Sequence, residues 1–409
     1  MWKRLVFLLL VGVWLAPWPD LIPKGKRFPV GVWPAWERVK NRKDAADFAT
    51  YYYATQVAFA GGDPYRTKSL SRAARKDLTR KSVHPYFYPP PFVLGMAWTQ
   101  PLDLKTAYHA WFWFNQLCLL ATLWIFWKWF RAGPLLLAFL GLTFTPFVDN
   151  IRMGQANLPV MMLAIVGLWH TRGLWVSAAA MCKMSPALLL GWWSGRGMFQ
   201  PVIVACVGAV AFSLAALPLI GWEAQWAFYT EILPKFSNGQ YHGLSVPITL
   251  PANHSIADLF NQYWPGPDKH SLDPLAKKWT SIVALGLLML IVLVGHRRRD
   301  PLGEACIAGA LVVLLVITPV YTYEHHLAML ALPLAAAGAA LTQGRLQRWW
   351  WPILLVGYWW LAWPLVWLRS VQDSFPDLHW FLQESKFFGE GILLLACLAG
   401  AVRSPKAPT

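Results

Sequence analysis

The feature that most restricts how this chain can fold is a series of apolar stretches that carry almost no charge. Many of them are about 15 to 20 residues long, the length that a helix needs to cross the hydrocarbon core of a bilayer. Within lipid, every backbone polar group needs a partner in the protein, so only helices and closed barrels can span a membrane. The alternating strands of about ten residues that are typical of barrels are missing from the sequence. The sequence therefore predicts an all-α, polytopic integral membrane protein.

The apolar stretches predict about 11 to 13 transmembrane helices in one domain covering residues 1–409. Two long polar regions, residues 19–87 and 221–277, interrupt them, and we expect both to be loops outside the cytoplasm. The predicted membrane segments are residues 5–18, 92–101, 106–128, 134–148, 157–170, 174–193, 199–220, 278–295, 303–319, 326–342, 349–368 and 387–402.

The net charge of +16 does not indicate a nucleic-acid partner, because many Lys and Arg residues lie in short clusters between apolar segments. Residues 296–299, 345–348 and 403–406 are such clusters, which the positive-inside rule assigns to the cytoplasm. A second basic group, residues 24–43 and 66–81, lies in the first polar region instead. Contact with anionic lipid or lipid phosphate is one reason for basic residues outside the cytoplasm.

The region 88–196 can be threaded through the membrane in two ways. Five crossings would put Lys128 and Arg131 outside, whereas three crossings and a re-entrant pair would put them inside. We prefer the second arrangement, in which Pro186 breaks the segment 174–193.

Asp47 lies just after the first apolar segment and is followed by the aromatic run Tyr51-Tyr-Tyr53. It is three residues from Asp44, so the two acids would share a face of a short helix. An acid beside a membrane, with aromatic neighbours, can place its carboxylate against a sugar as a proton acceptor. The alternative is a solvated acid on a surface helix.

Polar residues also interrupt the apolar segments. Such residues are energetically costly at membrane depth, so each of them suggests a function. Arg152, Gln155 and Asn157 stand between two apolar segments, where a guanidinium suits a phosphate and amides suit hydroxyls. A plain loop between helices is the alternative. Lys183 lies in the middle of an otherwise uncharged run and needs a partner or an anionic ligand.

Two further polar groups occur later in the chain. His325 and His326 stand at the start of an apolar segment, where phosphate recognition or proton transfer is a better interpretation than zinc binding. An interfacial polar cluster is the alternative. Asn253 belongs to Asn-His-Ser255 in the second polar region, which also fits a glycosylation sequon.

Taken together, these motifs resemble glycosyltransferase family 87. The resemblance covers about residues 44–340 and depends on six motifs that occur in the family's order. The motifs are Asp47-Phe with Tyr52-Tyr-Ala54, Gly62-Asp-Pro-Tyr65, Tyr88-Pro-Pro90, Gly154-Gln-Ala-Asn157, Lys183-Met-Ser-Pro186, and Thr318-Pro with His325-His326.

The resemblance implies a GT-C fold and an enzyme of the cell membrane. Such an enzyme moves a sugar, typically mannose, from a polyprenyl-phosphate donor to a lipid or glycan acceptor outside the cytoplasm, with inversion. It further implies that Asp47 is the general base on the acceptor hydroxyl. The other implied site residues are Arg152, Gln155, Asn157, Lys183, His325 and His326 for the donor phosphate and sugar, and Tyr52, Tyr88 and Asn253 for the acceptor or its loops.

The residues are chemically consistent with that activity. An inverting displacement needs one carboxylate to take the acceptor proton, and the leaving lipid phosphate needs fixed positive charge. We expect no cofactor, and a metal is not demanded because no second acid cluster accompanies Asp47. The competing hypothesis is a transporter or flippase for a lipid-linked or anionic substrate, which would use Lys183 and Arg152 but would not need Asp47.

Overall fold

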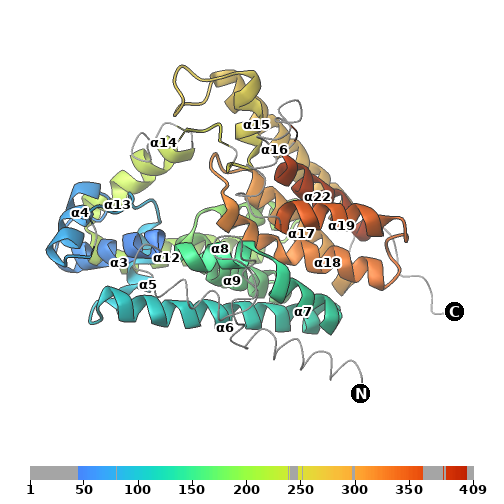
Figure 1. Cartoon of the computed structure of the whole chain (residues 1–409), viewed down its shortest axis with the longest axis horizontal. Coiled ribbons are helices and arrows are strands. Elements are labelled where there is room, and N and C mark those ends of the chain that lie inside the picture. Colours follow the sequence, from blue (N-terminus) through green and yellow to red (C-terminus); the bar gives the residue numbers. More distant parts are fainter. Residues whose placement is uncertain are drawn as a thin grey trace, which may run out of the picture.

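The computed structural model describes residues 45–402 apart from 80, 238, 240–246, 251, 297–299, 363–380 and 382–383. These residues form helices and connecting loops, and no strand occurs among them (Figure 1). The all-α, polytopic prediction is therefore confirmed. The predicted first membrane segment, residues 5–18, and Asp44 lie outside the described residues.

The first half of the described chain contains the helices of the first polar region and some of the membrane helices. In chain order they are α3 (Ala46–Phe59), α4 (Thr67–Lys76), α5 (Pro90–Gly95), η1 (Ala97–Thr99), α6 (Leu104–Phe130), α7 (Pro134–Thr143), α8 (Pro146–Met153), α9 (Asn157–His170), α10 (Gly173–Cys182), η2 (Ser185–Leu188), α11 (Leu189–Gly195) and α12 (Phe199–Ile220).

The second half contains the second polar region and the remaining membrane helices. They are α13 (Trp222–Ala227), the π-helix η3 (Phe228–Ile232), α14 (Leu233–Ser237), α15 (Ile256–Tyr263), α16 (Pro274–Gly295), α17 (Pro301–Ile317), the 3₁₀ helix η5 (Glu324–Leu330), α18 (Ala331–Thr342), α19 (Trp350–Ala362) and α22 (Ser385–Val402).

Five helical stretches among the described residues are long and apolar enough to cross a membrane. They are Leu104–Phe130, Phe199–Ile220, Pro274–Gly295, Glu324–Thr342 and Ser385–Val402. Helices α7 and α8 form a sixth if they count as one span, although they bend by 50° at the break between them. Three shorter apolar helices, α9, α10 and α17, accompany these spans. The larger total predicted from the sequence, and the side of each loop, stay predictions.

Most predicted segments correspond to observed helices, and two agree at both ends: residues 157–170 and 199–220. The segment 174–193 is broken, as predicted, because α10 ends at Cys182 and the chain restarts as η2 at Ser185-Pro186. The segment 92–101 differs from the prediction. It forms only the six-residue α5 and one 3₁₀ turn before Pro101, which is too short to cross a bilayer.

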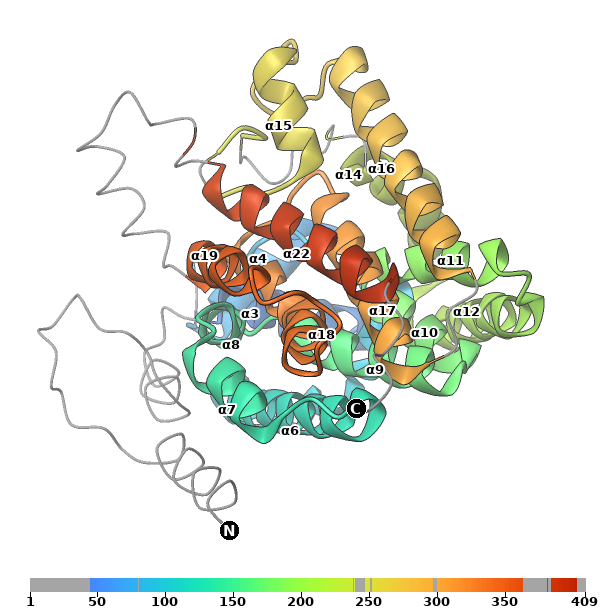
Figure 2. The ribbon, with the colours of Figure 1, turned by 90° about the vertical axis from the view of Figure 1, so that its right-hand side faces the viewer.

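Helix α17 lies at the centre of the described structure. All of its residues from Leu302 to Ile317 except Glu304 are buried, and α16, α18 and α22 pack around it (Figure 2). By contrast, α12 and α16 display large apolar side chains such as Val207, Leu214 and Leu285 on the surface. An apolar exterior of this kind is suited to lipid rather than to water.

The helices of the first polar region gather at one end of the molecule. Helices α3 and α4 pack against each other there, and α13 lies nearby (Figure 1). Helix α3 also contacts α5, α6, α8 and α12, so this loop rests directly on the ends of membrane helices. This contact brings the start of α3 to the break between α8 and α9.

Candidate active site

Asp47 lies in the first turn of α3, at the junction with α8. The residue before α3, Ala45, has a φ of 65°, a left-handed conformation that costs energy in a residue other than glycine. Its backbone N–H donates to the carbonyl of Arg152 at 2.7 Å. This hydrogen bond fixes the start of α3 against the end of α8 and so sets the position of Asp47.

Gly154 makes the close approach of α3 to the α8–α9 break possible. It ends α8 in a left-handed conformation with φ 68°. A Cβ at this position would lie 2.5 Å from the Cβ of Phe48, so a larger residue would push α3 away. Glycine therefore has both a conformational and a steric role here. The next residue, Gln155, is consequently held against Asp47.

The Asp47 carboxylate has two neighbours that can donate hydrogen bonds. Gln155 Nε2 donates to Asp47 Oδ2 at 2.8 Å, and His84 Nδ1 lies 3.4 Å from Asp47 Oδ1. The carboxylate is not sealed, because 16% of the Asp47 side chain and 58% of the His84 side chain are exposed. Asp47 is thus positioned by fixed partners and still accessible.

Two tyrosines orient Gln155 from the opposite side. Gln155 Oε1 lies 3.0 Å from the hydroxyls of both Tyr51 and Tyr88, which are 2.7 Å from each other. Burial and the negative charge of Asp47 raise the pKa of Tyr88, and burial raises that of Tyr51, so both hydroxyls stay protonated. At least one of them therefore donates to Oε1, which leaves the amide N–H of Gln155 directed at the carboxylate.

The surroundings keep Asp47 ionised. Burial acts to raise the pKa of Asp47, but the hydrogen bond from His84, the nearby His325 and the Gln155 amide outweigh it. The pKa of Asp47 therefore lies below its usual value. A carboxylate that is deprotonated and accessible can accept a proton from a hydroxyl group.

A second polar group surrounds Asn157, which is fully buried at the start of α9. Its Oδ1 accepts a 2.7 Å hydrogen bond from Lys183 Nζ, and its Nδ2 donates to the backbone carbonyl of His325 at 2.9 Å. One amide thus joins the break after α10 to the histidine segment of η5. This contact fixes the direction of the Lys183 ammonium group.

Arg152 and His326 border this second group. Arg152 pairs with Asp149 at 3.3 Å, and 42% of its side chain is exposed. It lies close enough to His325 to act on that ring electrostatically. The ring of His326 is 4.4 Å from that of His325, centre to centre, and its Nδ1 accepts a hydrogen bond from the backbone of Tyr323.

The Asp47 carboxylate, Lys183 and His325 belong to one electrostatic site. The charge of Asp47 acts on both Lys183 and His325, and His325 is also influenced by Lys183. Helices α8 and α9 both pack against η5, which holds these groups together. The structure therefore brings Asp47, Gln155, Tyr88, Asn157, Lys183, His325 and Arg152 into one region.

Two predicted site residues, Tyr52 and Asn253, form their hydrogen bonds in other parts of the structure. The Tyr52 hydroxyl donates to the carbonyl of Leu102 at 2.8 Å, on the side of α3 that faces the start of α6. Asn253 is fully buried, and its side chain bonds the backbone of Ile248, Val320 and Thr322. Its contacts join the second polar region to the segment before η5. Neither side chain hydrogen-bonds to the Asp47 group.

An ionic network that the sequence did not indicate supports the histidine segment. Glu324 accepts from His254 Nε2 at 3.0 Å and pairs with Lys386 Nζ at 3.1 Å. The network connects the second polar region, η5 and the first turn of α22. Glu324 directly precedes His325, so the network holds the backbone from which the histidines project.

The sequence contained few signals for these additional residues. Lys386 directly precedes the predicted segment 387–402, but α22 begins at Ser385 and buries it completely. His84 is an ordinary histidine in a polar region until the fold places it beside Asp47. Tyr51 was visible only as part of an aromatic run. Within the described ranges, no three His, Cys, Asp or Glu side chains are grouped as metal ligands would be.

A scan against protein-family models matches residues 86–319 to glycosyltransferase family 87. The matched stretch is more than half of the chain. The chain belongs to glycosyltransferase family 87. Membership of this family identifies it as a membrane glycosyltransferase, which uses a sugar donor and an acceptor, and decides against the transporter hypothesis. No curated protein and no solved structure matched the chain.

The family 87 match covers only part of the site. Tyr88, Arg152, Gln155, Asn157 and Lys183 fall inside the matched stretch, whereas Asp47 precedes it and the histidine pair follows it. The position of Asp47 in the site therefore depends on its contacts with matched residues, above all with Gln155.

Proposed function

We propose that this chain is a GT-C enzyme that transfers a hexose, expected to be mannose, from a polyprenyl-phosphate sugar to a lipid or glycan acceptor. The transfer takes place at the extracytoplasmic face of the cell membrane and inverts the anomeric configuration. The observation that best supports this proposal is an ionised, accessible carboxylate in the same site as a lysine, an arginine and a histidine pair.

The proposed reaction is a single displacement. The Asp47 carboxylate takes the proton of the acceptor hydroxyl while that oxygen attacks the anomeric carbon. The bond between this carbon and the phosphate oxygen breaks, and its electron pair leaves with the lipid phosphate. Lys183, Arg152 and the histidines stabilise the negative charge that develops on that phosphate.

Gln155 and Asn157 have positioning roles in this proposal. Gln155 holds the carboxylate of Asp47, and Asn157 holds the ammonium of Lys183. Only one residue separates the two amides in the sequence, so the proton acceptor and a phosphate-binding cation are positioned by one short segment. Such a rigid spacing favours reaction when donor and acceptor are bound together.

The test is a transfer assay with purified protein in nanodiscs, a radiolabelled polyprenyl-phosphate mannose and a membrane lipid extract. We expect labelled product from the wild type and none from Asp47→Asn. Transfer only with a different lipid-phosphate sugar would replace mannose and keep the class of reaction. Equal transfer by both proteins would refute Asp47 as the base.

A further inference from the structure

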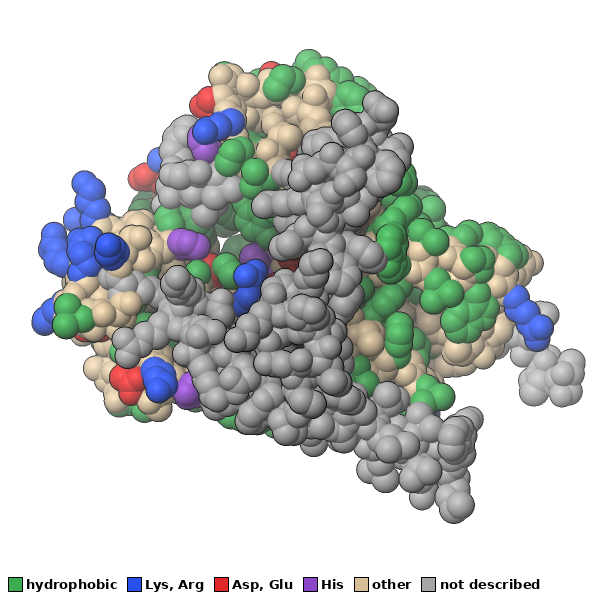
Figure 3. Space-filling model, viewed as in Figure 1, with side chains coloured by type: hydrophobic (Ala, Val, Ile, Leu, Met, Phe, Trp, Pro, Cys, Tyr) green, Lys and Arg blue, Asp and Glu red, His purple; other side chains and the backbone are tan. Residues whose placement is uncertain are grey.

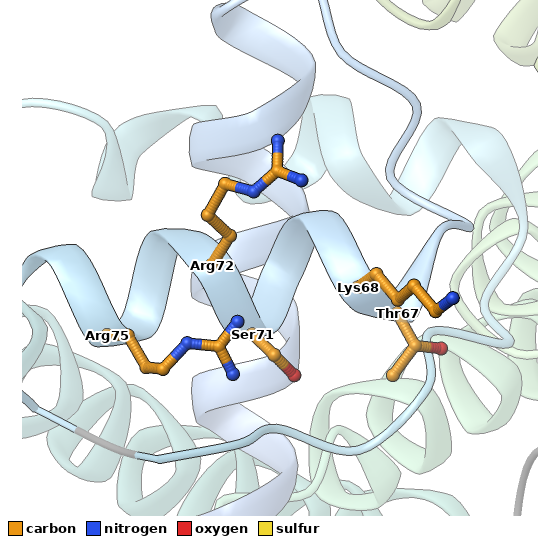
Figure 4. A pocket seen from close by; sticks show the side chains of 5 residues that line it. All are labelled: Thr67, Lys68, Ser71, Arg72 and Arg75. Carbon is orange, nitrogen blue, oxygen red and sulfur yellow. The ribbon is translucent and has the colours of Figure 1, made fainter.

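Helix α4 presents a basic cleft that the proposed reaction does not use. The cleft has a volume of about 330 Å³ and is lined by Thr67, Lys68, Ser71, Arg72 and Arg75. All five side chains come from this one helix (Figure 4). Thr67, Ser71 and Arg75 follow one another at intervals of four residues, and Lys68 and Arg72 form the neighbouring row, so they share a broad face.

The basic side chains of this face form no ion pair with described residues, and the exposed acid Asp77 follows directly after α4. Helix α4 contains no acid, and Lys68 and Arg72 are exposed and form no ion pair within the described part of the chain. Among the described residues, the Arg75 side chain donates only to the backbone carbonyl of Lys81. Basic side chains gather at the end of the molecule where α4 lies (Figure 3). Such a face attracts an anion with several oxygen atoms.

An exposed leucine lies immediately beyond the basic face. Leu78 follows the end of α4 with a φ of 54°, at a position where helices commonly place glycine. A leucine in this conformation is strained, and 90% of the side chain is exposed. Packing within the protein therefore does not offset the strain. Contact of the leucine side chain with an apolar phase outside the protein would offset this strain.

The position of α4 fits the headgroup layer of a membrane. Helix α4 packs on α3, which is bonded to the segment directly before the membrane helix α6. Gln56 Nε2 donates to the carbonyl of Gln100 at 3.2 Å, two residues from the Leu102 carbonyl that Tyr52 binds. Since α6 begins at Leu104, α4 packs on a helix that contacts the start of a membrane-spanning helix.

We propose that α4 is a docking site for an anionic phospholipid of the surrounding membrane. Lys68, Arg72 and Arg75 bind the headgroup phosphate, the hydroxyls of Thr67 and Ser71 donate to its oxygens, and Leu78 inserts among the upper acyl carbons. A basic cluster combined with an apolar side chain is a typical means of binding an anionic membrane surface. This site is separate from the transfer reaction.

Native mass spectrometry of the full-length protein in neutral detergent tests the proposal, with phosphatidylglycerol and phosphatidylcholine as probes. We expect wild type to prefer phosphatidylglycerol, and the triple variant Lys68→Gln/Arg72→Gln/Arg75→Gln to bind it about tenfold more weakly. Leu78→Asn removes the apolar side chain but suits the left-handed backbone, so it should weaken lipid binding without loss of folding. The matched control, Lys235→Gln/Lys277→Gln/Lys278→Gln, removes the same charge elsewhere and should bind as wild type.

Three results would overturn the proposal. The α4 variant would bind phosphatidylglycerol as wild type does, or the control would lose as much affinity as the α4 variant. Alternatively, millimolar inorganic phosphate would displace the lipid completely, which would identify a site for free phosphate instead. None of these readouts involves sugar transfer, so they are independent of the role of Asp47.

Discussion

Asp47 and Glu324 are two carboxylates with almost equal exposure but different partners. The exposed fraction is 16% for the Asp47 side chain and 13% for that of Glu324. Asp47 bonds a neutral amide and a histidine that is largely in solvent, whereas Glu324 bonds His254 and Lys386, of which 1% and 0% are exposed. The partners, rather than burial, distinguish the two acids.

This difference indicates different tasks. The charge of Glu324 is compensated by a buried ammonium, so gaining a proton would leave Lys386 unpaired in a low-dielectric interior. No ion pair with Lys or Arg holds Asp47 within the described chain, so a proton taken up by Asp47 leaves no buried Lys or Arg side chain without its partner. We therefore expect changes at Asp47 to affect transfer, and changes at the Glu324 network to affect folding.

The largest expected effect is the loss of transfer in Asp47→Asn. Removing a general base lowers the rate by about a hundredfold to ten-thousandfold, while the melting temperature in detergent should stay close to that of the wild type. Initial rates with saturating donor measure the effect. Asp77→Asn, an exposed acid at the end of α4, is the matched control and should retain full activity. If the melting temperature of Asp47→Asn fell together with the rate, Asp47 would be needed for folding, as we expect for Glu324, and the contrast between the two acids would be wrong.

In contrast to Asp47→Asn, Lys386→Met should lower the stability of the fold. It leaves Glu324 buried without its cation, which costs about 3–5 kcal/mol of unfolding free energy. Thermal denaturation in detergent measures the change. The double variant Glu324→Gln/Lys386→Met removes both charges and should recover much of the stability. If the single and double variants had the same melting temperature, the ion pair would have no structural role.

A smaller effect is expected for Gln155→Leu. This change removes a hydrogen bond to Asp47 and the Oε1 acceptor that Tyr51 and Tyr88 share, so we expect a loss of about tenfold to a hundredfold in kcat. Gln200→Leu replaces an exposed glutamine in the first turn of α12 and should be neutral. An unchanged kcat in Gln155→Leu would mean that Asp47 is positioned by other contacts.

The smallest effect concerns pH and the variant His84→Gln. Asp47 must be deprotonated to act, so activity falls as pH drops through its pKa, which His84 helps to lower. Without His84 the pKa of Asp47 rises, and the acid limb of the pH–rate profile moves to higher pH. Profiles of kcat from acidic to neutral pH test this, with His270→Gln as the control. A shift to lower pH would contradict the assignment of Asp47 as the base.

The sequence by itself determined the class of fold and most of the chemical groups. Uncharged stretches of membrane length allow only helices, so the prediction held for α9 and α12 to the residue. Residues such as Gln155, Asn157 and Lys183 stood out because polar groups are costly in an apolar context. These are local properties, which a linear pattern can report.

Only the tertiary structure decided which groups meet. His84 and Gln155 are 37 and 108 residues from Asp47 along the chain, and Lys386 lies beyond several helices from His254. The shortness of α5 was not predicted either. The composition of an apolar stretch does not reveal where prolines and glycines end its helix. Pairings between distant segments depend on how helices pack. The close contact of Gly154 with Phe48 is one such packing feature, and it places the Gln155 amide against Asp47.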